Sequence, residues 1–364
     1  MKIVADQAIA DVADVFAPLG ELVLLPGRDI GPGDVRDADA LLVRTITRVD
    51  ETLLAGSRVQ FVGSAASGTD HIDQDYLAAH AVRCCSAPGC NADAVVNYVM
   101  AALAWLELNE GVTWRDRPVG IMGAGNVGSR LATLLLALGM EVRVHDPFLA
   151  ANHPLAGSFA TLDDVLACRL VSLHVPLTHD GPHPTWHVLG NYRLAQLAPE
   201  TVLINAARGE VVDNNALLAL LETRADLTVA LDVWEFEPDI DSRLLARVAI
   251  GTPHIAGYSL NGKRNATRMV YEGLCEHFQL PPSAFNEKAA KPVIEAGSVS
   301  EAVLKAYPIE QDFLSLEASD LGAEFERRRN GYHFRREFRD CCFKADDWSV
   351  ADSRVLKALG FVAQ

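Results

Sequence analysis

The sequence predicts an α/β protein whose strands form doubly wound, parallel sheets. Short apolar runs alternate with helix-length segments from the N-terminus to about residue 275, which is the pattern of repeated βαβ units. One of these units, residues 119–146, holds a glycine triplet of the form G-x-G-x-x-G between an apolar run and a helical segment. Together these two observations predict a nucleotide-binding fold.

Composition and charge exclude several classes of protein. With 364 residues and 49% hydrophobic content, the chain can form two or three domains with sizeable cores and is not a disordered protein. The net charge of −16 argues against general binding of nucleic acid or of an anionic membrane surface. The longest apolar stretch, Val95 to Leu106, is too short to span a bilayer.

The N-terminus and the cysteines favour the cytoplasm. The chain enters a strand at Lys2 without the layout of a signal peptide. Its seven cysteines are odd in number, and no paired C-x-x-C spacing typical of a metal site occurs. We therefore expect free thiols in a reducing compartment and no metal site.

The first ninety residues alternate strands with helical segments. Strands are expected at 3–6, 22–25, 40–43 and 61–64, and a helix at 10–19. The third strand delivers Arg44 and Thr45 at its carboxyl end, and the fourth is followed by the small, polar run 65–69. Because ligands bind at the carboxyl ends of parallel strands, these two loops should share one crevice. Arg44 taken alone could equally be a solvated loop charge.

Each glycine of the triplet has a separate task. Gly123 permits the tight turn out of the strand, Gly125 lets a pyrophosphate approach bare backbone, and Gly128 lets the helix pack closely on the strand. Asn126 and Val127 open that helix, whose N-terminus offers unpaired N–H groups and a partial positive charge to phosphates.

The glycine unit follows a long helix that starts near Asn91, and it ends on an acid. Gly139 closes the helix after the triplet, and a second strand then ends at Asp146, 18 positions after Gly128. Asp146 can accept hydrogen bonds from the adenosine ribose, and its charge would repel the 2′-phosphate of NADP. NAD is therefore the expected cofactor. For the triplet alone, a glycine-rich surface turn is the alternative.

Three polar residues follow the later strands of the chain. These strands are expected at 170–176, 201–205, 227–232 and 249–254. Arg208 could grip a substrate carboxylate through two parallel hydrogen bonds, and His254 could take the hydroxyl proton as hydride leaves the same carbon. Glu237, bonded to the other ring nitrogen, would fix the tautomer and favour the protonated ring. Singly each could be a surface Arg, a satisfied His or a helix-start Glu, but together they suit oxidation of a 2-hydroxy acid.

Several motifs match a known family. They are GAGNVG at 123–128, NAARG at 205–209, LDVWEFEP at 231–238 and TPHIAG at 252–257. Through them the sequence resembles the D-2-hydroxyacid dehydrogenase family. Further motifs resemble the branch of that family that oxidises 4-phospho-D-erythronate, namely LVRTIT at 42–47, GTDHID at 68–73, APGCN at 87–91 and HIAGYS at 254–259. The resemblance covers nearly the whole chain and is strong to about residue 275.

This resemblance implies roles for individual residues. Arg208, Glu237 and His254 match the catalytic trio, with His254 as the acid/base. The cofactor contacts expected from motif and resemblance together are Gly123, Gly125, Asn126, Val127, Gly128, Asp146, Val175, Ala206, Ala207, Arg208, Asp232 and Gly257. The substrate contacts expected are Arg44, Thr45, Ala66, Ser67 and Tyr258. The family usually has threonine where Ala66 and Val175 stand, and commonly glycine where Phe236 stands.

Chain order gives the domain boundaries. A flavodoxin-like α/β substrate domain is expected over 1–91 plus 258–280, and a Rossmann-type NAD domain over 92–257. After the linker Pro281-Pro282, a small α+β domain is expected over 281–364. In the resembling enzymes this last segment is a dimerisation domain, so a homodimer is implied. Its arginine runs predict a solvated or interfacial surface more readily than a nucleic-acid site.

Two functional classes stay open. The first is an NAD-dependent dehydrogenase that oxidises 4-phospho-D-erythronate to 2-oxo-3-hydroxy-4-phosphobutanoate in pyridoxal 5′-phosphate biosynthesis. Within this class, 3-phosphoglycerate or another D-2-hydroxy acid is the alternative substrate. The second class is an NAD(H)-sensing binding protein that kept the fold. Because a fold alone does not decide function, the intact trio is what favours the enzyme.

Overall fold

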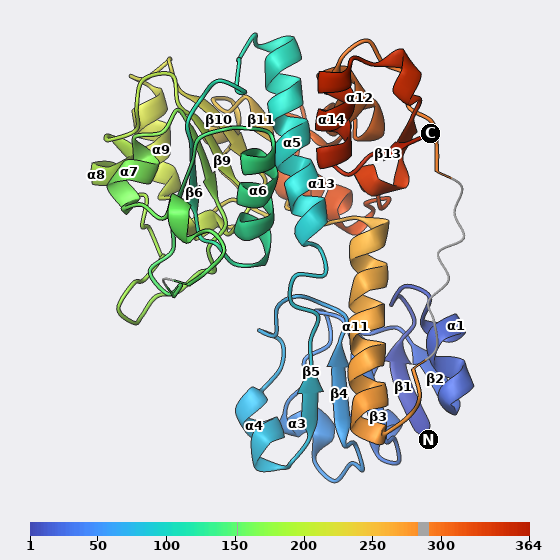
Figure 1. Ribbon diagram of the computed structural model, residues 1–364. Helices are drawn as coiled ribbons and strands as arrows, with labels where there is room; N and C mark the ends of the chain where they lie inside the picture. Colours follow the sequence, from blue (N-terminus) through green and yellow to red (C-terminus); the bar gives the residue numbers. More distant parts are fainter. Residues whose placement is uncertain (151, 283–290) are drawn as a thin grey trace. The chain divides into compact units, whose positions relative to one another are not determined.

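The computed structural model describes residues 1–150, 152–282 and 291–364 (Figure 1). The chain forms two compact units, Met1–Asn91 with the segment that starts at Ser259, and Ala92–Tyr258 with Lys291–Gln364. Each unit has its own parallel sheet and its own core. Among the described helices none combines the length and the apolar character needed to cross a membrane.

The first unit has a five-stranded sheet in the order β2-β1-β3-β4-β5. The strands are β1 (Lys2–Asp6), β2 (Glu21–Leu25), β3 (Ala40–Val43), β4 (Phe61–Ser64) and β5 (Arg83–Cys85). The helices are α1 (Val12–Phe16), α2 (Pro32–Val35), α3 (Glu51–Leu54), α4 (Gln74–Ala79) and α11 (Leu260–Phe278). This strand order is the flavodoxin-like order that was predicted. The helix predicted over 10–19 is shorter, since α1 gives way to a 3₁₀ turn that contains Pro18.

Helices cover both faces of this sheet, because successive residues of a strand point to opposite sides. On one face Leu41 and Val62 pack with α2, α3 and α4. On the other face Leu42 and Phe61 pack with α1 and with α11, which lies along the sheet in Figure 1. The chain therefore returns to its first unit at residue 259, close to the predicted return at 258.

The second unit has a six-stranded parallel sheet in the order β11-β10-β9-β8-β6-β7. The strands are β6 (Val119–Met122), β7 (Val142–His145), β8 (Leu170–Leu173), β9 (Val202–Asn205), β10 (Thr228–Leu231) and β11 (Ile250–Gly251). Beyond β7, Phe159 pairs with Val144 in a single parallel bridge, in the place of an edge strand. If the strands of this unit are numbered along the chain, with the bridge at Phe159 as the third, they lie across the sheet in the order 3-2-1-4-5-6-7. This is the order of Rossmann-type sheets. The order reverses between β6 and β8, where such sheets bind their ligands.

Helices also cover both faces of the second sheet. On one side lie α5 (Ala92–Asn109) and α6 (Asn126–Ala137), and on the other α7 (Leu162–Leu166), α8 (Asn191–Leu194), α9 (Asn214–Leu221) and α10 (Ser242–Leu245). Figure 1 shows α5 between α6 and the C-terminal helices. Most side chains of α5 are buried on every side of the helix, so it needs a cover on both sides.

The C-terminal segment supplies that second cover, and the separate domain expected at 281–364 stays a prediction. It contains α12 (Val299–Ala306), α13 (Leu321–Asn330), β12 (Cys342–Phe343), α14 (Val350–Ala358) and β13 (Val362–Ala363). Its described part, 291–364, belongs to the second unit, because Val303, Phe338 and Phe343 share one core with α5 and the sheet. Residues 283–290 of the predicted domain lie outside the described residues. No disulfide joins the seven cysteines, all of which lie in the described part of the chain.

Candidate active site

The glycine turn after β6 has the geometry that its three glycines predict. Gly123 adopts φ +90°, and a Cβ there would lie 2.5 Å from the His174 carbonyl oxygen. A Cβ at Gly128 would overlap the Gly123 carbonyl oxygen, so α6 packs directly on the turn. A Cβ at Gly125 would meet no described atom within 4 Å, and no side chain caps α6 there. The turn thus leaves open backbone and first-turn N–H groups for a ligand phosphate.

Asp146 is bonded to this turn. Its Oδ2 accepts a hydrogen bond from the Ala124 N–H at 2.9 Å, and its Oδ1 accepts one from the Phe148 N–H at 3.1 Å. Val175, after β8, lies beside the same turn, with Cγ1 2.8 Å from the position of a Cβ on Gly123. The arrangement of these residues fits a dinucleotide, with a half-buried carboxylate next to the phosphate-binding turn.

His254 and Glu237 lie together in the second unit. Glu237 Oε2 is 2.8 Å from His254 Nδ1, and its Oε1 accepts a hydrogen bond from the Trp234 N–H at 2.9 Å. The carboxylate is therefore fixed at both oxygens. Because Nδ1 donates to a carboxylate, neutral His254 keeps its Nε2 as a proton acceptor.

The backbone at His254 is held in an unusual conformation by Asp232. His254 has φ +56°, in the left-handed region that costs a residue other than glycine of order 1 kcal/mol. The Asp232 carboxylate, 1% exposed, accepts hydrogen bonds from the N–H groups of Ile255 at 2.8 Å and Ala256 at 2.9 Å, and from the Thr252 hydroxyl at 2.7 Å. The role that the structure gives Asp232 is to hold the His254 loop. Its contact with NAD stays a prediction.

Arg208 lies on a neighbouring turn and is not bonded to the other two members of the trio in the described residues. Asn205 shapes this turn, since its side chain donates to the Arg208 carbonyl at 3.0 Å and accepts from the Ala207 N–H at 3.1 Å. A Cβ at Gly209 would overlap the Trp234 backbone, so the turn packs against the segment that leads to Glu237. The guanidinium of Arg208 is exposed and donates to the Ala207 carbonyl.

Phe236 stands where the resemblance implies glycine, and its backbone has the conformation that glycine favours. It adopts φ +62° and is 74% exposed. The left-handed backbone suits glycine, whereas a phenylalanine there pays steric strain without packing its ring. The turn that presents Glu237 is kept despite this substitution.

Two C-terminal arginines reach this site, and the sequence analysis assigned neither of them to it. Arg335 donates to the carbonyl oxygens of Ile255 at 3.1 Å, Ala256 at 2.6 Å and Tyr258 at 2.6 Å. Arg329 Nη1 lies 3.8 Å from Glu237 Oε2. The runs of arginine in the sequence predict a solvated surface. No local sequence pattern indicates that Arg329 and Arg335 contact residues so distant in the chain.

Tyr258, a predicted substrate contact, packs its ring against the C-terminal segment. Its ring centroid lies 5.6 Å from that of Phe334 and 5.8 Å from that of Tyr332. Gly257 lies on the same loop and is half-buried. Substrate contact by Tyr258 and cofactor contact by Gly257 stay predictions.

In the first unit, Arg44 is paired with a buried carboxylate. Its Nε lies 2.7 Å from Asp6 Oδ2 and its Nη2 3.4 Å from Oδ1, while Asp6 is 0% exposed. Burial and the charge of Arg44 lower the pKa of Lys263 to about 8, and Asp6 opposes this shift. Arg44 and Lys263 thus bring two cations close to Asp6, an arrangement that suits an anion. The sequence analysis did not single out Lys263, because it lies more than 200 residues from Arg44 in the chain.

The other predicted substrate residues lie on exposed loops of this unit. Thr45 follows Arg44 and is exposed. The Ala66 carbonyl accepts a hydrogen bond from the Ala87 N–H at 3.0 Å, and the Ser67 hydroxyl accepts one from the Gly89 N–H at 3.4 Å. These bonds tie the run at 65–69 to the loop before α5.

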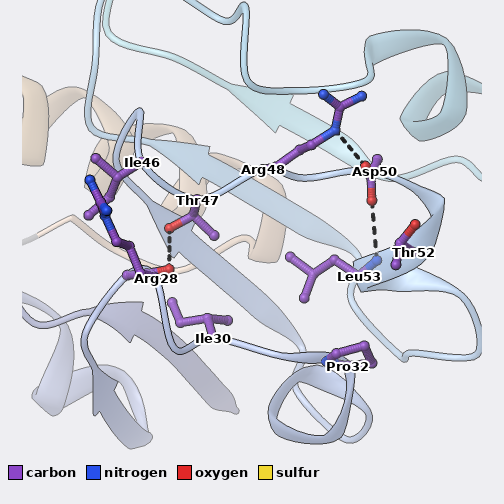
Figure 2. Close-up of a pocket in the computed structure, with 10 residues that line it drawn as sticks. Arg28, Ile30, Pro32, Ile46, Thr47, Arg48, Asp50, Thr52 and Leu53 are labelled. Carbon is purple, nitrogen blue, oxygen red and sulfur yellow. Dashed lines mark hydrogen bonds and ion pairs between the residues drawn. The ribbon is translucent and has the colours of Figure 1, made fainter.

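A hollow of about 560 Å³ opens in the first unit beside the loop that follows β3 (Figure 2). The Thr47 hydroxyl donates to the Gly27 carbonyl at 2.8 Å in its wall, and Arg48 is paired with Asp50 at 2.7 Å. None of the predicted site residues lines this hollow, so it supports no assignment of the substrate site.

One group of three potential metal ligands occurs among the described residues, at His187, Asp213 and Glu235. His187 Nε2 lies 2.6 Å from Glu235 Oε1, and Glu235 Oε2 accepts from the Asn214 N–H at 2.8 Å. Asp213 caps α9 through the Ala216 N–H at 2.9 Å. These bonds join the loop before α8 to the start of α9, which is a structural role.

Comparison with known proteins identifies the family. The model for "D-isomer specific 2-hydroxyacid dehydrogenase, NAD binding domain" matches residues 96–256. The erythronate-4-phosphate dehydrogenase of Cellvibrio japonicus is 43% identical over 99% of this chain and 99% of its own. That of Azotobacter vinelandii is 48% identical over 80% of this chain and 77% of its own.

Solved structures share the fold. An NAD⁺-bound 3-phosphoglycerate dehydrogenase from Entamoeba histolytica matches with a TM-score of 0.62 and 24% identity, covering 77% of this chain and 95% of that one. A D-lactate dehydrogenase from Aquifex aeolicus matches with a TM-score of 0.60 and 22% identity, covering 77% and 96%. Fold and site together define an NAD-dependent D-isomer specific 2-hydroxyacid dehydrogenase. Within that class, the chain belongs to the erythronate-4-phosphate dehydrogenase family.

Proposed function

We propose that this protein oxidises 4-phospho-D-erythronate at C2 with NAD, giving 2-oxo-3-hydroxy-4-phosphobutanoate and NADH in pyridoxal 5′-phosphate biosynthesis. The main support is the His254–Glu237 pair, at 2.8 Å, which follows the strands of a dinucleotide-binding sheet. Relatives that cover the full chain are named erythronate-4-phosphate dehydrogenases. The intact pair favours an enzyme over a nucleotide sensor.

The cofactor would be held by the glycine turn and by Asp146. Phosphates would take N–H groups at the start of α6, and Asp146 would take the adenosine ribose. NAD, when bound, accepts the hydride that leaves C2 of the substrate. The predicted contacts of Val175, Ala206 and Gly257 belong to this proposal.

His254 and Arg208 act on the substrate itself. Nε2 of His254 takes the proton of the C2 hydroxyl as C2 becomes a carbonyl carbon, and the resulting positive ring is stabilised by Glu237. Arg208 grips the substrate carboxylate through two parallel hydrogen bonds. The hydroxyl thus gives one proton to His254, and C2 gives one hydride to NAD. This accounts for the two electrons that the substrate loses.

The phosphate of the substrate would be bound in the first unit. Arg44 is already oriented by Asp6, and Lys263 adds a second cation near it. Guanidinium and ammonium groups both suit phosphate oxygens. Hydroxyls of Thr45 and Ser67 would complete this set, with Ala66 in the same loop.

One assay tests the function. The purified protein is mixed with NAD and, in parallel, with 4-phospho-D-erythronate or 3-phosphoglycerate, and NADH is followed by its absorbance. We expect a much higher kcat/KM with 4-phospho-D-erythronate. Preference for 3-phosphoglycerate would change the substrate, and NAD binding without oxidation of either acid would support a sensor.

A cytoplasmic homodimer completes the proposal. In the described part of the C-terminal segment, Val293, Leu316, Val350 and Val362 are exposed, with Val350 at 91%. Contiguous exposed apolar surface is typical of protein contacts, and the resemblance implies a dimer through this segment. The seven thiols without a disulfide suit a reducing compartment.

Light scattering at micromolar concentration tests the dimer. Because residues 291–364 share the core of the second unit, removing them would expose that core, so point changes are the better test. We expect Val350→Asp with Leu316→Asp to halve the mass. Tyr192→Asp, at a 77% exposed position outside the segment, is the control. A monomeric parent would refute the dimer.

A further inference from the structure

The C-terminal segment contacts the loop that carries His254 and the carboxylate that orients it. We infer that Arg335 and Arg329 are positioning residues for the His254–Glu237 pair, so that residues 291–364 form part of the catalytic apparatus. This inference rests on the proposed function. It assigns to the segment a role apart from dimerisation.

Arg335 holds the carbonyl side of the His254 loop. Its guanidinium donates to three carbonyls of that loop, at residues 255, 256 and 258, and to the Ala94 carbonyl of α5 at 3.1 Å. The side chain is 8% exposed. Asp232 accepts the N–H groups of the same loop at residues 255 and 256. The loop is therefore fixed from both sides, which keeps His254 in its left-handed backbone conformation.

Arg335 is itself held by aromatic and acidic partners of the same segment. Its guanidinium carbon lies 4.1 Å from the centre of the Tyr307 ring, and its Nη1 lies 3.2 Å from the Tyr332 hydroxyl. Asp312 accepts from the hydroxyls of Tyr307 at 2.7 Å and Tyr332 at 2.9 Å. This buried network orients the guanidinium before any substrate binds.

Arg329 lies at the end of α13, a helix that packs against the segment around Glu237. Phe325 of α13 shares a core with Trp234, and a Cβ on Gly322 would lie 2.7 Å from Asp239 Oδ1. Arg329 Nη1 then lies 3.8 Å from Glu237 Oε2, the oxygen bonded to His254. A positive charge at this point offsets part of the field that Glu237 exerts on the imidazole.

The expected effect has a definite sign. Glu237 favours the protonated imidazole, whereas oxidation needs the neutral ring as base, and Arg329 shifts the balance toward the neutral ring. The other charged groups on the surrounding elements are Asp232, Asp239, Asp312, Arg327, Arg328, His333 and Arg335. None of these changes when Arg329 is replaced, so the difference between variants reports Arg329.

Nuclear magnetic resonance of labelled histidine tests Arg329 without relying on turnover. The His254 signal is assigned by its loss in His254→Gln, and its titration midpoint is compared between parent and variants. We expect Arg329→Gln to raise the midpoint by about 0.2–0.7 pH unit, the range for a partly exposed ion pair. The acidic limb of kcat/KM should move by the same amount, while Glu237→Gln should move it the opposite way.

Two further variants make this test specific. Arg329→Lys keeps the charge and should restore the parent midpoint. Arg327→Gln is the matched control, because Arg327 lies on the same helix, is 70% exposed and pairs with Glu324. An unmoved midpoint in Arg329→Gln would overturn the role of Arg329. The titration remains informative even if the protein oxidises none of the acids tested, so the two proposals fail separately.

Arg335 is tested by the kinetics of folded protein. Arg335→Met keeps an unbranched stem and loses the hydrogen bonds to the loop carbonyls, so kcat measured below the thermal transition should fall at least about tenfold, as expected when a base loses its position. Arg335→Lys should recover part of the loss. If Arg335 only stabilised the fold, its replacement would lower the thermal midpoint and leave kcat of the folded protein unchanged. That result would overturn the positioning role of Arg335. Should neither variant fold, Arg329→Gln decides the inference.

Discussion

The glycine turn and the His254 loop are both strand-end loops of one sheet, yet they are built in different ways. The turn is shaped by residues 119–146 together with His174 and Val175 of the next strand end, so most of its contacts are close in sequence. The His254 loop is held by Asp232, Glu237 and Arg335, the last of them 80 positions after Ile255. The cofactor half of the site is therefore a local product of the sequence, whereas the catalytic half is assembled from the whole length of the second unit.

Replacing His254 should show the difference between the glycine turn and the His254 loop most clearly. His254→Ala removes the base and leaves the glycine turn untouched, so kcat should fall by about 10²–10⁴-fold. The dissociation constant of NADH, measured by fluorescence titration, should stay near that of the parent. Oxidation of 4-phospho-D-erythronate at the parent rate would show that another group takes the proton.

Replacing Arg44 tests whether the first unit reads the phosphate. Arg44→Ala should raise KM for 4-phospho-D-erythronate by about 10–100-fold, the usual cost of losing charged hydrogen bonds, with a smaller change in kcat. Because Asp6 loses its cation, circular dichroism must confirm the fold. The control is Arg28→Ala, an exposed arginine in the wall of the hollow of Figure 2. An unchanged KM in Arg44→Ala would place phosphate recognition elsewhere.

His174 should make the turn region sensitive to acid. Its carbonyl lies against Gly123, its Nδ1 is enclosed without a partner among the described residues, and burial lowers its pKa to about 4 from 6.5. The folded protein thus resists a proton that the unfolded chain accepts, and stability is lost as pH falls from about 6.5 toward 4.

At pH 5 the lowered pKa of His174 should reduce the free energy of unfolding by about 2 kcal/mol, and near pH 7 the reduction should be small. The free energy of unfolding, measured in urea at both pH values, should fall less for His174→Gln than for the parent. Equal losses in the two proteins would show that the imidazole is hydrated or paired when folded.

Cofactor choice is expected to be the smallest of these effects. Asp146 repels a 2′-phosphate, so kcat/KM should be at least about tenfold higher with NAD than with NADP, which corresponds to about 1.4 kcal/mol. Asp146→Ser should narrow that preference mainly through KM for NADP, and His254 should titrate as in the parent. Comparable efficiency of the parent with both cofactors would contradict the assignment of Asp146.

What could be predicted from the sequence follows the same division between local and distant contacts. The βαβ order, the three glycines and the end of the second strand at Asp146 depend on neighbours in the chain, and the structure agrees with them. The catalytic trio could be proposed because strand ends meet at one edge of a parallel sheet, and Glu237 and His254 are indeed bonded.

Contacts that cross long stretches of chain could not be predicted. Nothing near Arg44 indicates that Asp6 would take its guanidinium, since 38 residues separate them. Arg335 stands in a run of charged residues, where a buried arginine has no local signal. The double proline predicts a separate C-terminal domain, but nothing near it indicates that residues 291–364 pack on the apolar surface of α5 in the second unit.

The hydrogen bonds from Arg335 to the His254 loop also bear on when a newly made chain becomes active. Domains fold largely from the N-terminus as they leave the ribosome. A nascent chain that has emerged to about residue 260 already contains the glycine turn, Asp146, Glu237 and His254, but the guanidinium that fixes the His254 loop is made about 75 residues later. If Arg335 positions the His254 loop as inferred, full activity awaits the synthesis of residue 335, and a chain that loses its C-terminus to a protease would keep its cofactor residues without a fixed base.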